Sequence, residues 1–463
     1  RRSSLESRTR RLLPWMILAW AALTAVGIGL LRLNMGLVIT FAGLFTVLLA
    51  TALLAPAVTV ALMKLVAPLS GRLAGAIGRL APRDIVRSLS RTSVAIAALM
   101  MAVTAIIGVS IMVSSFRGTV VQWLDQTLQA DIYVSPPRTA SGLTPGGLDD
   151  ETVARLRSWP GVARAVTSHT VDMALPGSGR LVRIVSVDGD ISRGNRPYAW
   201  IRDDLGRNPW PALEAGEGVI ISEALVRKED LPIPPPPVEL STAEGPRALP
   251  VLAVFYDYST DQGSIFIDND LYRELWHDDS VSALGLFVEP GRPIDELLAE
   301  MQAAYAGRPG LLIQSNEGLR SSSMETFDRA FAITSSLRLL AVIVAFIGVL
   351  SALMSLQLER GRELGTLRAT GMTRPQLWSL TLLETGLMGA VAGLLAMPVG
   401  YMLAWILIYV INVRSFGWTL QMGLQPEHFL QAPAVAISAA LLAGIYPSIR
   451  AGKMEIASAL REE

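Results

Sequence analysis

The stretch Leu350–Gln376 decides how this chain is organised, and from Ser351 it reads SALMSLQLERGRELGTLRATGMTRPQ. An apolar run over Leu339–Leu356 precedes its charged part, and a second apolar run follows Arg374-Pro375. Charges between two such runs must stay hydrated, so lipid tails cannot hold this segment. The pattern therefore predicts a membrane helix that leaves the bilayer, a short charged amphipathic helix, and a second helix that re-enters the bilayer.

Composition supports a membrane protein. Of the 463 residues, 51% are hydrophobic and only 17% are charged, whereas ordinary soluble domains carry about 25% charged residues. The apolar residues lie in long runs separated by a polar block, which is typical of a polytopic membrane protein. The formal net charge is zero, which gives no reason to expect a nucleic-acid partner.

The sequence offers little material for a metal or thiol site. Cysteine is absent, which excludes disulfides, thiol catalysis and Cys-based metal sites. His169, His277 and His428 are far apart and lack ligand spacing, so we expect them to be unrelated surface or packing residues.

Six apolar runs are long enough to cross a bilayer. The arginines before the first run and those of the connector Lys64–Arg91 favour the cytoplasmic side. We also expect a kink at Pro56 in the second span and an interruption at Pro447 in the sixth. The predicted order is a cytoplasmic basic N-terminus (1–13), two transmembrane helices (14–63), a cytoplasmic basic amphipathic connector (64–91), a third transmembrane helix (92–115), an extracytoplasmic α+β domain (116–329), a stalk and fourth transmembrane helix (330–358), a cytoplasmic coupling helix (359–376), a fifth transmembrane helix (377–411), an outer loop (412–431), a sixth transmembrane helix (432–450) and a cytoplasmic tail (451–463).

The polar block 116–329 predicts an α+β domain split by a β-rich insertion. A helix over Asp149–Trp159, capped by Asp149 or Asp150, lies near its start. A strand over Val281–Val288, a helix over Ile294–Tyr305 and a strand over Gly310–Gln314 close it. We expect the following segment to be one long helix, from Glu325 to Leu358.

The fifth span carries two features that leave alternatives open. Gly389 and Gly393 form a small-xxx-small pair, which permits close helix approach either within the chain or at a dimer seam. Glu384 is an ionisable residue at membrane depth. We favour a structural role for it over a role in transport.

The segment Glu359–Tyr401, ERGRELGTLRATGMTRPQLWSLTLLETGLMGAVAGLLAMPVGY, resembles the C-terminal core of FtsX-like permeases, which include the MacB-like exporters. The pattern of that family is close to E-R-x-R-E-I-G-x-L-R-A-L-G followed by a glycine-rich membrane helix. The tail from Ile445 is similar to the family's closing motif, although Glu455-Ile456 stand where Asp-Pro is usual. A weaker likeness covers Leu80–Phe116.

In this weaker region, the basic residues Arg83, Arg87 and Arg91 are similar to the family's short basic helix before a membrane helix. Because they are four residues apart, we expect one stripe on one helix face. They either serve the family's role or only set topology and bind anionic headgroups.

The resemblance implies a separate ABC ATPase subunit, acting as a dimer, that binds ATP and holds the segment Leu358–Gly371. No G-x-x-x-x-G-K-[ST] loop and no G-x-S-x-G elbow occur in this chain. We therefore expect no enzyme activity and no cofactor in this chain itself. The residues expected to couple to the ATPase are Glu359, Arg360, Arg362, Glu363, Leu364, Gly365, Leu367, Arg368 and Gly371.

The resemblance further implies a permease subunit that uses ATP-driven motion of the outer domain to export or extract a hydrophobic or lipid-like substrate. The alternative is a transmembrane regulator that activates an extracytoplasmic cell-wall hydrolase by the same motion. An ATP-independent scaffold is disfavoured by the coupling segment. We expect the plasma (bacterial inner) membrane, with both termini cytoplasmic.

The family's minimal unit has four spans, so the first two spans here are extra. This layout resembles the C-terminal half of a ten-span permease. The partners implied are the ATPase, membrane lipid, a first permease half or a second permease copy, and an extracytoplasmic protein in the case of a regulator.

Overall fold

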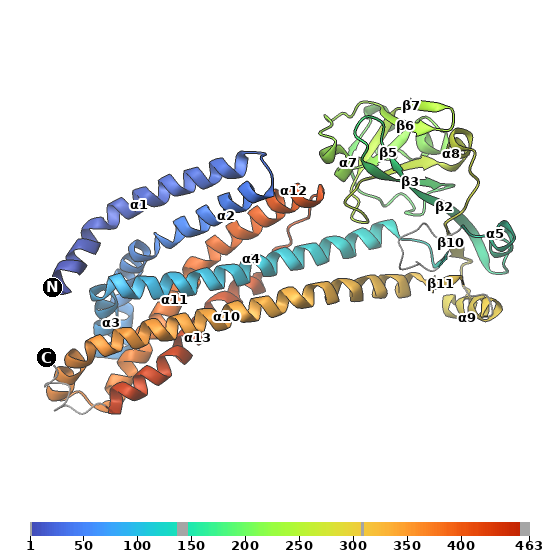
Figure 1. Ribbon diagram of the computed structural model, residues 1–463. Helices are drawn as coiled ribbons and strands as arrows, with labels where there is room; N and C mark the ends of the chain where they lie inside the picture. Colours follow the sequence, from blue (N-terminus) through green and yellow to red (C-terminus); the bar gives the residue numbers. More distant parts are fainter. Residues whose placement is uncertain (1, 137–146, 307–309, 454–463) are drawn as a thin grey trace. The chain divides into compact units, whose positions relative to one another are not determined.

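The computed structural model describes residues 2–136, 147–306 and 310–453 and divides into two compact units (Figure 1). The helical unit comprises Arg1–Phe116, Phe331–Arg414 and Met422–Glu463. The α+β unit comprises Arg117–Ala330 and Ser415–Gln421.

Long helices make up the helical unit. Five segments of the described residues have the length and composition to cross a membrane: Leu12–Arg32, Leu37–Arg87, Leu89–Thr127, Arg374–Phe416 and Pro426–Tyr446. The predicted fourth span lies in α10, where many side chains fall outside the described part. The helices are α1 (Arg2–Arg32), α2 (Leu37–Ala52), α3 (Ala55–Arg87), α4 (Leu89–Thr127), α10 (Asn316–Ala369), α11 (Arg374–Ile406), a π-helical turn (Leu407–Asn412), α12 (Val413–Phe416) and α13 (Pro426–Lys453).

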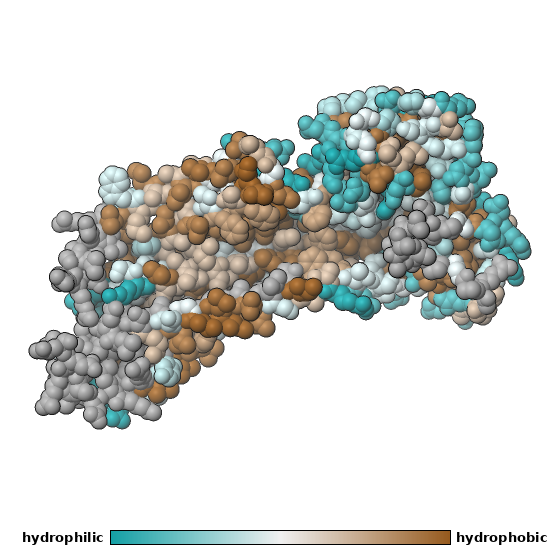
Figure 2. All heavy atoms as spheres, viewed as in Figure 1, coloured by the Kyte–Doolittle hydropathy of each residue, from teal (hydrophilic) through white to brown (hydrophobic). Residues whose placement is uncertain are grey.

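The face of the helical unit seen in Figure 2 is largely apolar where it is coloured, and large hydrophobic side chains such as Trp15 and Val38 are exposed on α1 and α2. Exposed apolar surface of this extent is expected where lipid is the solvent. The chain is therefore a multi-pass helical membrane protein with an α+β unit inserted between its spans.

Three features of the helices differ from the sequence-based expectation: a break in the predicted second span, a bend within α3, and the continuity of α13. The predicted second span breaks at Leu53–Leu54, and Pro56 stands in the first turn of α3, where its missing N–H costs nothing. Helix α3 then bends at Ala74–Gly75, and Gly75 has φ +58, a conformation that suits glycine. The prediction of an interruption at Pro447 was wrong, because α13 continues to Lys453. Neighbouring helices can satisfy the carbonyl that a proline leaves free.

The α+β unit is built on one nine-stranded mixed sheet in the order β11-β1-β10-β2-β3-β9-β5-β8-β4. The first strand, β1, pairs antiparallel with both β10 and β11, so the two ends of the polar block meet in the sheet. The strands are β1 (Ile132–Ser135), β2 (Val162–Ala174), β3 (Leu181–Val187), β4 (Tyr198–Ile201), β5 (Val219–Ser222), β6 (Val238–Thr242), β7 (Gly245–Leu249), β8 (Val251–Phe255), β9 (Ser264–Asp268), β10 (Ala283–Val288) and β11 (Leu312–Ser315), with β6 and β7 forming a separate hairpin.

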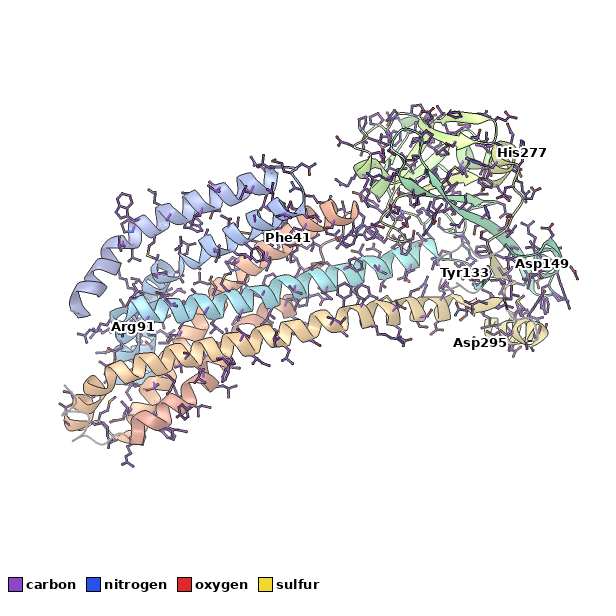
Figure 3. The ribbon with its side chains drawn as sticks, in the orientation of Figure 1. Phe41, Arg91, Tyr133, Asp149, His277 and Asp295 are labelled. Atoms are coloured by element: carbon purple, nitrogen blue, oxygen red, sulfur yellow. The ribbon has the colours of Figure 1, made fainter. Side chains whose placement is uncertain are left out.

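Short helices cover the sheet, and side-chain caps fix where several begin. Asp149 accepts a hydrogen bond from the Thr152 N–H and caps the start of α5 (Figure 3). The sequence had predicted either Asp149 or Asp150 as this cap. Asp268 accepts hydrogen bonds from two N–H groups at the start of α8. The helices of this unit are α5 (Asp150–Arg157), α6 (Trp210–Glu214), α7 (Glu223–Lys228), α8 (Asn269–Trp276) and α9 (Ile294–Tyr305).

The α+β architecture was predicted correctly, including the strand, helix and strand that close the block. Two clusters form the larger part of its core. One, around Ile132, Leu284 and Leu297, joins β1 and β10 to α9. The other, around Ile184, Ile221 and Ile265, lies within the insertion.

Candidate functional site

The predicted coupling segment is the end of α10, not a separate short helix. Helix α10 continues from Asn316 to Ala369, because this part of the sequence contains no proline and its leucine, arginine and glutamate residues favour helix. The backbone of the predicted residues Glu359, Arg360, Arg362, Glu363, Leu364 and Gly365 is therefore helical, while their side chains lie outside the described part.

A tight glycine cap ends α10. The Met372 N–H donates to the Leu367 carbonyl at 3.0 Å, and the Gly371 N–H donates to the Arg368 carbonyl at 3.1 Å. These two bonds define a Schellman motif, which needs a residue with positive φ at the position of Gly371. The φ of Gly371 is +103, so the predicted site residue Gly371 has a structural function in ending the helix.

Leu367 has a structural function as well. It is half-buried and packs with Met372 against Leu377, which is fully buried. An apolar contact of this kind accompanies Schellman motifs. Leu367 is therefore occupied within the chain, and Arg368 is half-buried beside it.

Helix α11 begins just after this turn, with a capping box. The Thr373 hydroxyl accepts a hydrogen bond from the Gln376 N–H at 3.4 Å, and the Gln376 side chain accepts one from the Thr373 N–H at 2.9 Å. Pro375 lies in the first turn, where its ring is compatible with the helix. Only four residues, Thr370 to Thr373, separate the two capped helices, so the connection between α10 and α11 is short and well defined.

An apolar pocket of about 520 Å³ lies on the first turns of α11. Trp378 lines it and is 43% exposed. The other described residues of its wall are Pro375, Ser379, Leu382 and Leu383. This pocket was not predicted from the sequence. The available signal was Trp378, which follows shortly after the helix start at Arg374-Pro375.

The predicted basic stripe is not on one helix. Arg83 and Arg87 are exposed on α3, whereas Arg91 is exposed on α4 (Figure 3). The two helices are separated at Ser88, whose φ and ψ of −102° and 31° are not helical. The Thr92 hydroxyl stabilises this break by donating to the Ile85 carbonyl at 3.1 Å.

Gly389 and Gly393 lie against α13. A Cβ atom on Gly389 would come within 2.8 Å of the Ala436 carbonyl oxygen, and one on Gly393 within 2.7 Å of the Pro433 Cα. The pair therefore faces another helix of the same chain. Glu384 is half-buried on the same helix.

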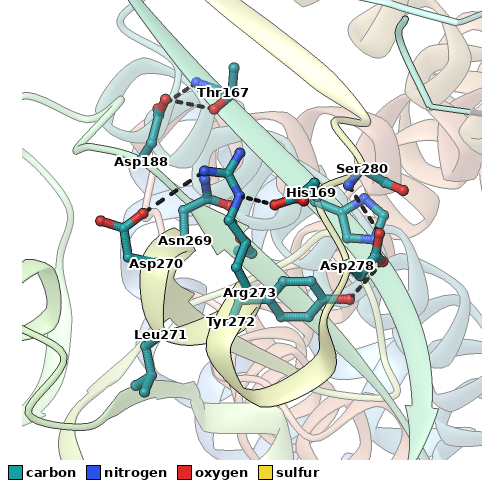
Figure 4. A network of polar contacts seen from close by, with 12 residues as sticks. Thr167, His169, Asp188, Asn269, Asp270, Leu271, Tyr272, Arg273, Asp278 and Ser280 are labelled. Atoms are coloured by element: carbon teal, nitrogen blue, oxygen red, sulfur yellow. Dashed lines mark hydrogen bonds and ion pairs between the residues drawn. The ribbon is translucent and has the colours of Figure 1, made fainter. Parts of the chain in front are cut away.

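A polar network around His169 lies in the α+β unit (Figure 4). His169 Nε2 is 3.2 Å from Asp278 Oδ2, and His169 Nδ1 is 3.0 Å from Ser282 Oγ. The ionised Asp278 can only accept, so Nε2 carries the hydrogen and Nδ1 accepts from Ser282. The Tyr272 hydroxyl donates to Asp278 as well, at 3.2 Å.

Burial shapes the ionisation of this network. Burial is the main cause that lowers the pKa of His169, and the nearby Asp278 carboxylate acts in the opposite sense. Hydrogen bonding with Ser280 lowers the pKa of Asp278. A neutral, fully hydrogen-bonded histidine fits a packing role, as the sequence predicted. Within the described part of the chain, no three His, Asp or Glu side chains are placed to hold a metal ion.

Comparison with known proteins gives two sequence relatives. The chain is 53% identical over 464 residues to "Uncharacterized ABC transporter permease protein Rv0987" of Mycobacterium tuberculosis, covering 100% of this chain and 54% of that protein. It is 24% identical over 186 residues to "Macrolide export ATP-binding/permease protein MacB" of Hyphomonas neptunium, covering 40% of this chain and 28% of that protein. The chain thus spans about half the length of the first relative.

Solved structures give weaker similarity. The periplasmic region of MacB from Actinobacillus actinomycetemcomitans aligns with 43% of this chain and 94% of its own, at 8% identity and a TM-score of 0.31. The extracellular domain of the noncanonic ABC-type transporter YknZ from Gram-positive bacteria aligns with 40% of this chain and 98% of its own, at 12% identity and a TM-score of 0.27.

One protein-family model matches the part of the chain that contains the Gly371 turn and the packed helices α11 and α13. Residues 335–456 match the model described as FtsX-like permease C-terminal. Residues 335–456 of the chain are therefore similar to the C-terminal part of FtsX-like permeases, and the chain over its whole length is similar to about half of an ABC transporter permease protein.

Proposed function

We propose that this chain is a permease component of an ABC transporter that exports or extracts a hydrophobic or lipid-like substrate. A separate ATPase subunit, acting as a dimer, binds ATP and contacts the end of α10. The homology to a permease over the whole chain supports this assignment. The chain itself is the non-catalytic part of such a transporter and needs no cofactor of its own.

The observation that carries the proposal is the continuity of α10. Its 54 residues form one helix, about 80 Å long at 1.5 Å per residue. Its first residues belong to the α+β unit and its charged end to the helical unit. A continuous helix transmits displacement, so a force on the charged end reaches the α+β unit.

The coupling contacts are assigned to the charged last turns of α10. Glu359, Arg360, Arg362 and Glu363 offer both signs of charge to a partner, and Leu364 offers an apolar side chain next to them. Because Leu367 packs within the chain, it serves the coupling by fixing the turn.

The orientation proposed is that of a bacterial inner-membrane protein with both termini in the cytoplasm and the α+β unit outside. The exposed arginines of the connector, Arg83, Arg87 and Arg91, support this under the positive-inside rule. They also suit contacts with anionic lipid headgroups.

A further permease part is expected in the working assembly, because the aligned relative is about twice as long as this chain. A first permease half, as in a ten-span protein, or a second permease copy would supply it. Gly389 and Gly393 are already packed on α13, so the seam with that part lies on another face.

The test is ATP-dependent movement of lipid-like probes. The full-length protein and its ATPase are reconstituted in lipid vesicles, and release of fluorescent lipids or hydrophobic dyes from the membrane is followed with ATP and with a non-hydrolysable analogue. We expect ATP-dependent release of at least one probe class. If no probe is released but a cell-wall hydrolase becomes active when ATP is turned over, the result would instead support the alternative function of a transmembrane regulator.

A further inference from the structure

The segment Ser415–Gln421 belongs to a different compact unit from the residues on either side of it in the sequence. It belongs to the α+β unit, whereas Arg414 before it and Met422 after it belong to the helical unit. In the sequence it lies between α11 and α13, and its first two residues belong to the short helix α12. Its contacts show what holds it to the α+β unit.

One buried carboxylate is the main anchor. Glu223, the first residue of α7, is 6% exposed. Its Oε2 accepts the Thr419 N–H at 3.0 Å, and its Oε1 accepts the Thr419 hydroxyl at 2.7 Å. Arg227 completes the arrangement with an ion pair of 2.7 Å to Glu223 and a hydrogen bond of 3.2 Å to the Thr419 hydroxyl.

The segment is held on its other side by aromatic residues. The Tyr258 hydroxyl donates to the Thr419 carbonyl at 2.9 Å, so the N–H, hydroxyl and carbonyl of Thr419 are all bound. Trp418 is 7% exposed and packs edge-on against Tyr258, with ring centroids 5.9 Å apart. Gly417 has φ +81 and brings the backbone close to Ala224.

We infer that Glu223 is a positioning residue that keeps Ser415–Gln421 docked on the α+β unit throughout the working cycle. The docked segment is then a further mechanical connection, in addition to the continuous helices α4 and α10, and it links α11 and α13 to that unit. Undocking would leave a buried carboxylate with Arg227 as its main partner and would strip Thr419 of its bonds, which is unfavourable. The inference rests on the proposed function for its role in coupling, but the docking itself does not.

The first test locks the segment. The chain contains no cysteine, so Ala224→Cys with Gly417→Cys gives a single defined pair. A Cβ on Gly417 would lie 3.5 Å from the Ala224 Cβ, which suits a disulfide. We expect the oxidised full-length protein, with its ATPase in lipid, to turn over ATP and move probes as fast as the reduced protein. Activity that is lost on oxidation and restored by reductant would overturn the inference; each single-cysteine variant controls for strain and oxidation.

The second test needs no ATPase, so it separates failure of the docking from failure of the proposed function. Amide hydrogen exchange of residues 415–421 is measured in the full chain for Glu223→Ala and Glu223→Gln. We expect exchange to rise about tenfold or more in Glu223→Ala, because bonds to a charged group are lost, and less in Glu223→Gln. The control is Glu217→Ala, which removes a surface ion pair between Glu217 and Arg202 in the same unit. Unchanged exchange in both Glu223 variants would contradict the docking.

Discussion

The Met372 N–H donates to the Leu367 carbonyl at 3.0 Å, and the side chains of both residues pack on Leu377. Leu367 thus lies in the last turn of α10, and Met372 leads into α11. Backbone and side-chain contacts act together in this turn, so α10 cannot rotate or slide without moving the start of α11. This relationship makes the turn a defined structural joint.

Replacing Gly371 by alanine tests the joint. A non-glycine residue at φ +103 is strained, so Gly371→Ala should lower the free energy of unfolding by about 1–2 kcal/mol. Gly348→Ala is the matched control, because it lies in α10 with open space around its Cα. That variant should be stabilised by up to about 1 kcal/mol. Thermal unfolding in detergent measures both, and equal shifts would contradict the cap.

Thr373 should contribute through its capping box. Thr373→Ala removes the hydroxyl that accepts the Gln376 N–H and should cost about 1 kcal/mol. Thr326→Ala on α10 is the control, since its exposed hydroxyl only bonds back to the Ser322 carbonyl. Its substitution should leave the unfolding midpoint within the surface range of about 0.5 kcal/mol. A Thr373 variant as stable as the control would show that the box contributes nothing.

Gly389 should tolerate no side chain. An alanine Cβ there would meet the backbone of α13 at 2.8–2.9 Å, so Gly389→Ala should destabilise the protein by about 1–3 kcal/mol. At Gly386 the nearest atom is the end of the Leu441 side chain at 3.4 Å. Gly386→Ala should therefore be neutral or stabilising. Identical unfolding midpoints for the two variants would mean that α11 and α13 do not pack closely.

The α+β unit should lose stability as the pH falls through the ordinary pKa of histidine. Burial lowers the pKa of His169, so below about pH 6.5 the unfolded chain binds a proton that the folded chain does not. Stability is therefore present above that pH and decreases toward the lower pKa of the folded state. Asp278, whose pKa is also lowered, adds a loss only at more acidic pH.

The comparison of His169→Gln with His277→Asn checks this prediction, with unfolding followed by tryptophan fluorescence between about pH 7.5 and about pH 5.5. His277 is exposed and has φ +55, which asparagine tolerates. The decline on acidification should be smaller in His169→Gln and unchanged in His277→Asn. An equal decline in both variants would exclude His169 as its source.

Local sequence signals predicted much of the fold. An acidic cap predicted α5, and the pattern over Ile294–Tyr305 predicted α9 with its observed bounds. The long helix was also predicted, although it extends beyond Glu325–Leu358 at both ends. The short elements β9 and α7 were missed, because fully buried strands and single-turn helices lack a periodic pattern.

Contacts between residues far apart in the sequence, and local breaks within helices, were less accessible to prediction. The bonds from Thr419 to Glu223 join residues 196 positions apart, and no spacing rule predicts such a pair. The break at Ser88 that divides the arginine stripe depends on hydroxyl groups bonding to backbone carbonyls, which propensity does not reveal. Coupling by the segment Leu358–Gly371 stays a prediction, and the packing of Leu367 on Leu377 required knowledge of its neighbours in space.

ATP turnover by the reconstituted complex carrying Glu363→Lys, with Glu325→Lys as control, shows whether the charged end of α10 couples to the ATPase. Both residues lie on α10, and Glu325 is 67% exposed in a simple surface pair with Arg329. If the charged end of α10 receives the ATPase, Glu363→Lys should abolish stimulation of turnover by the permease while Glu325→Lys retains it. Full stimulation in Glu363→Lys, with the ATPase still bound, would contradict the proposed coupling site.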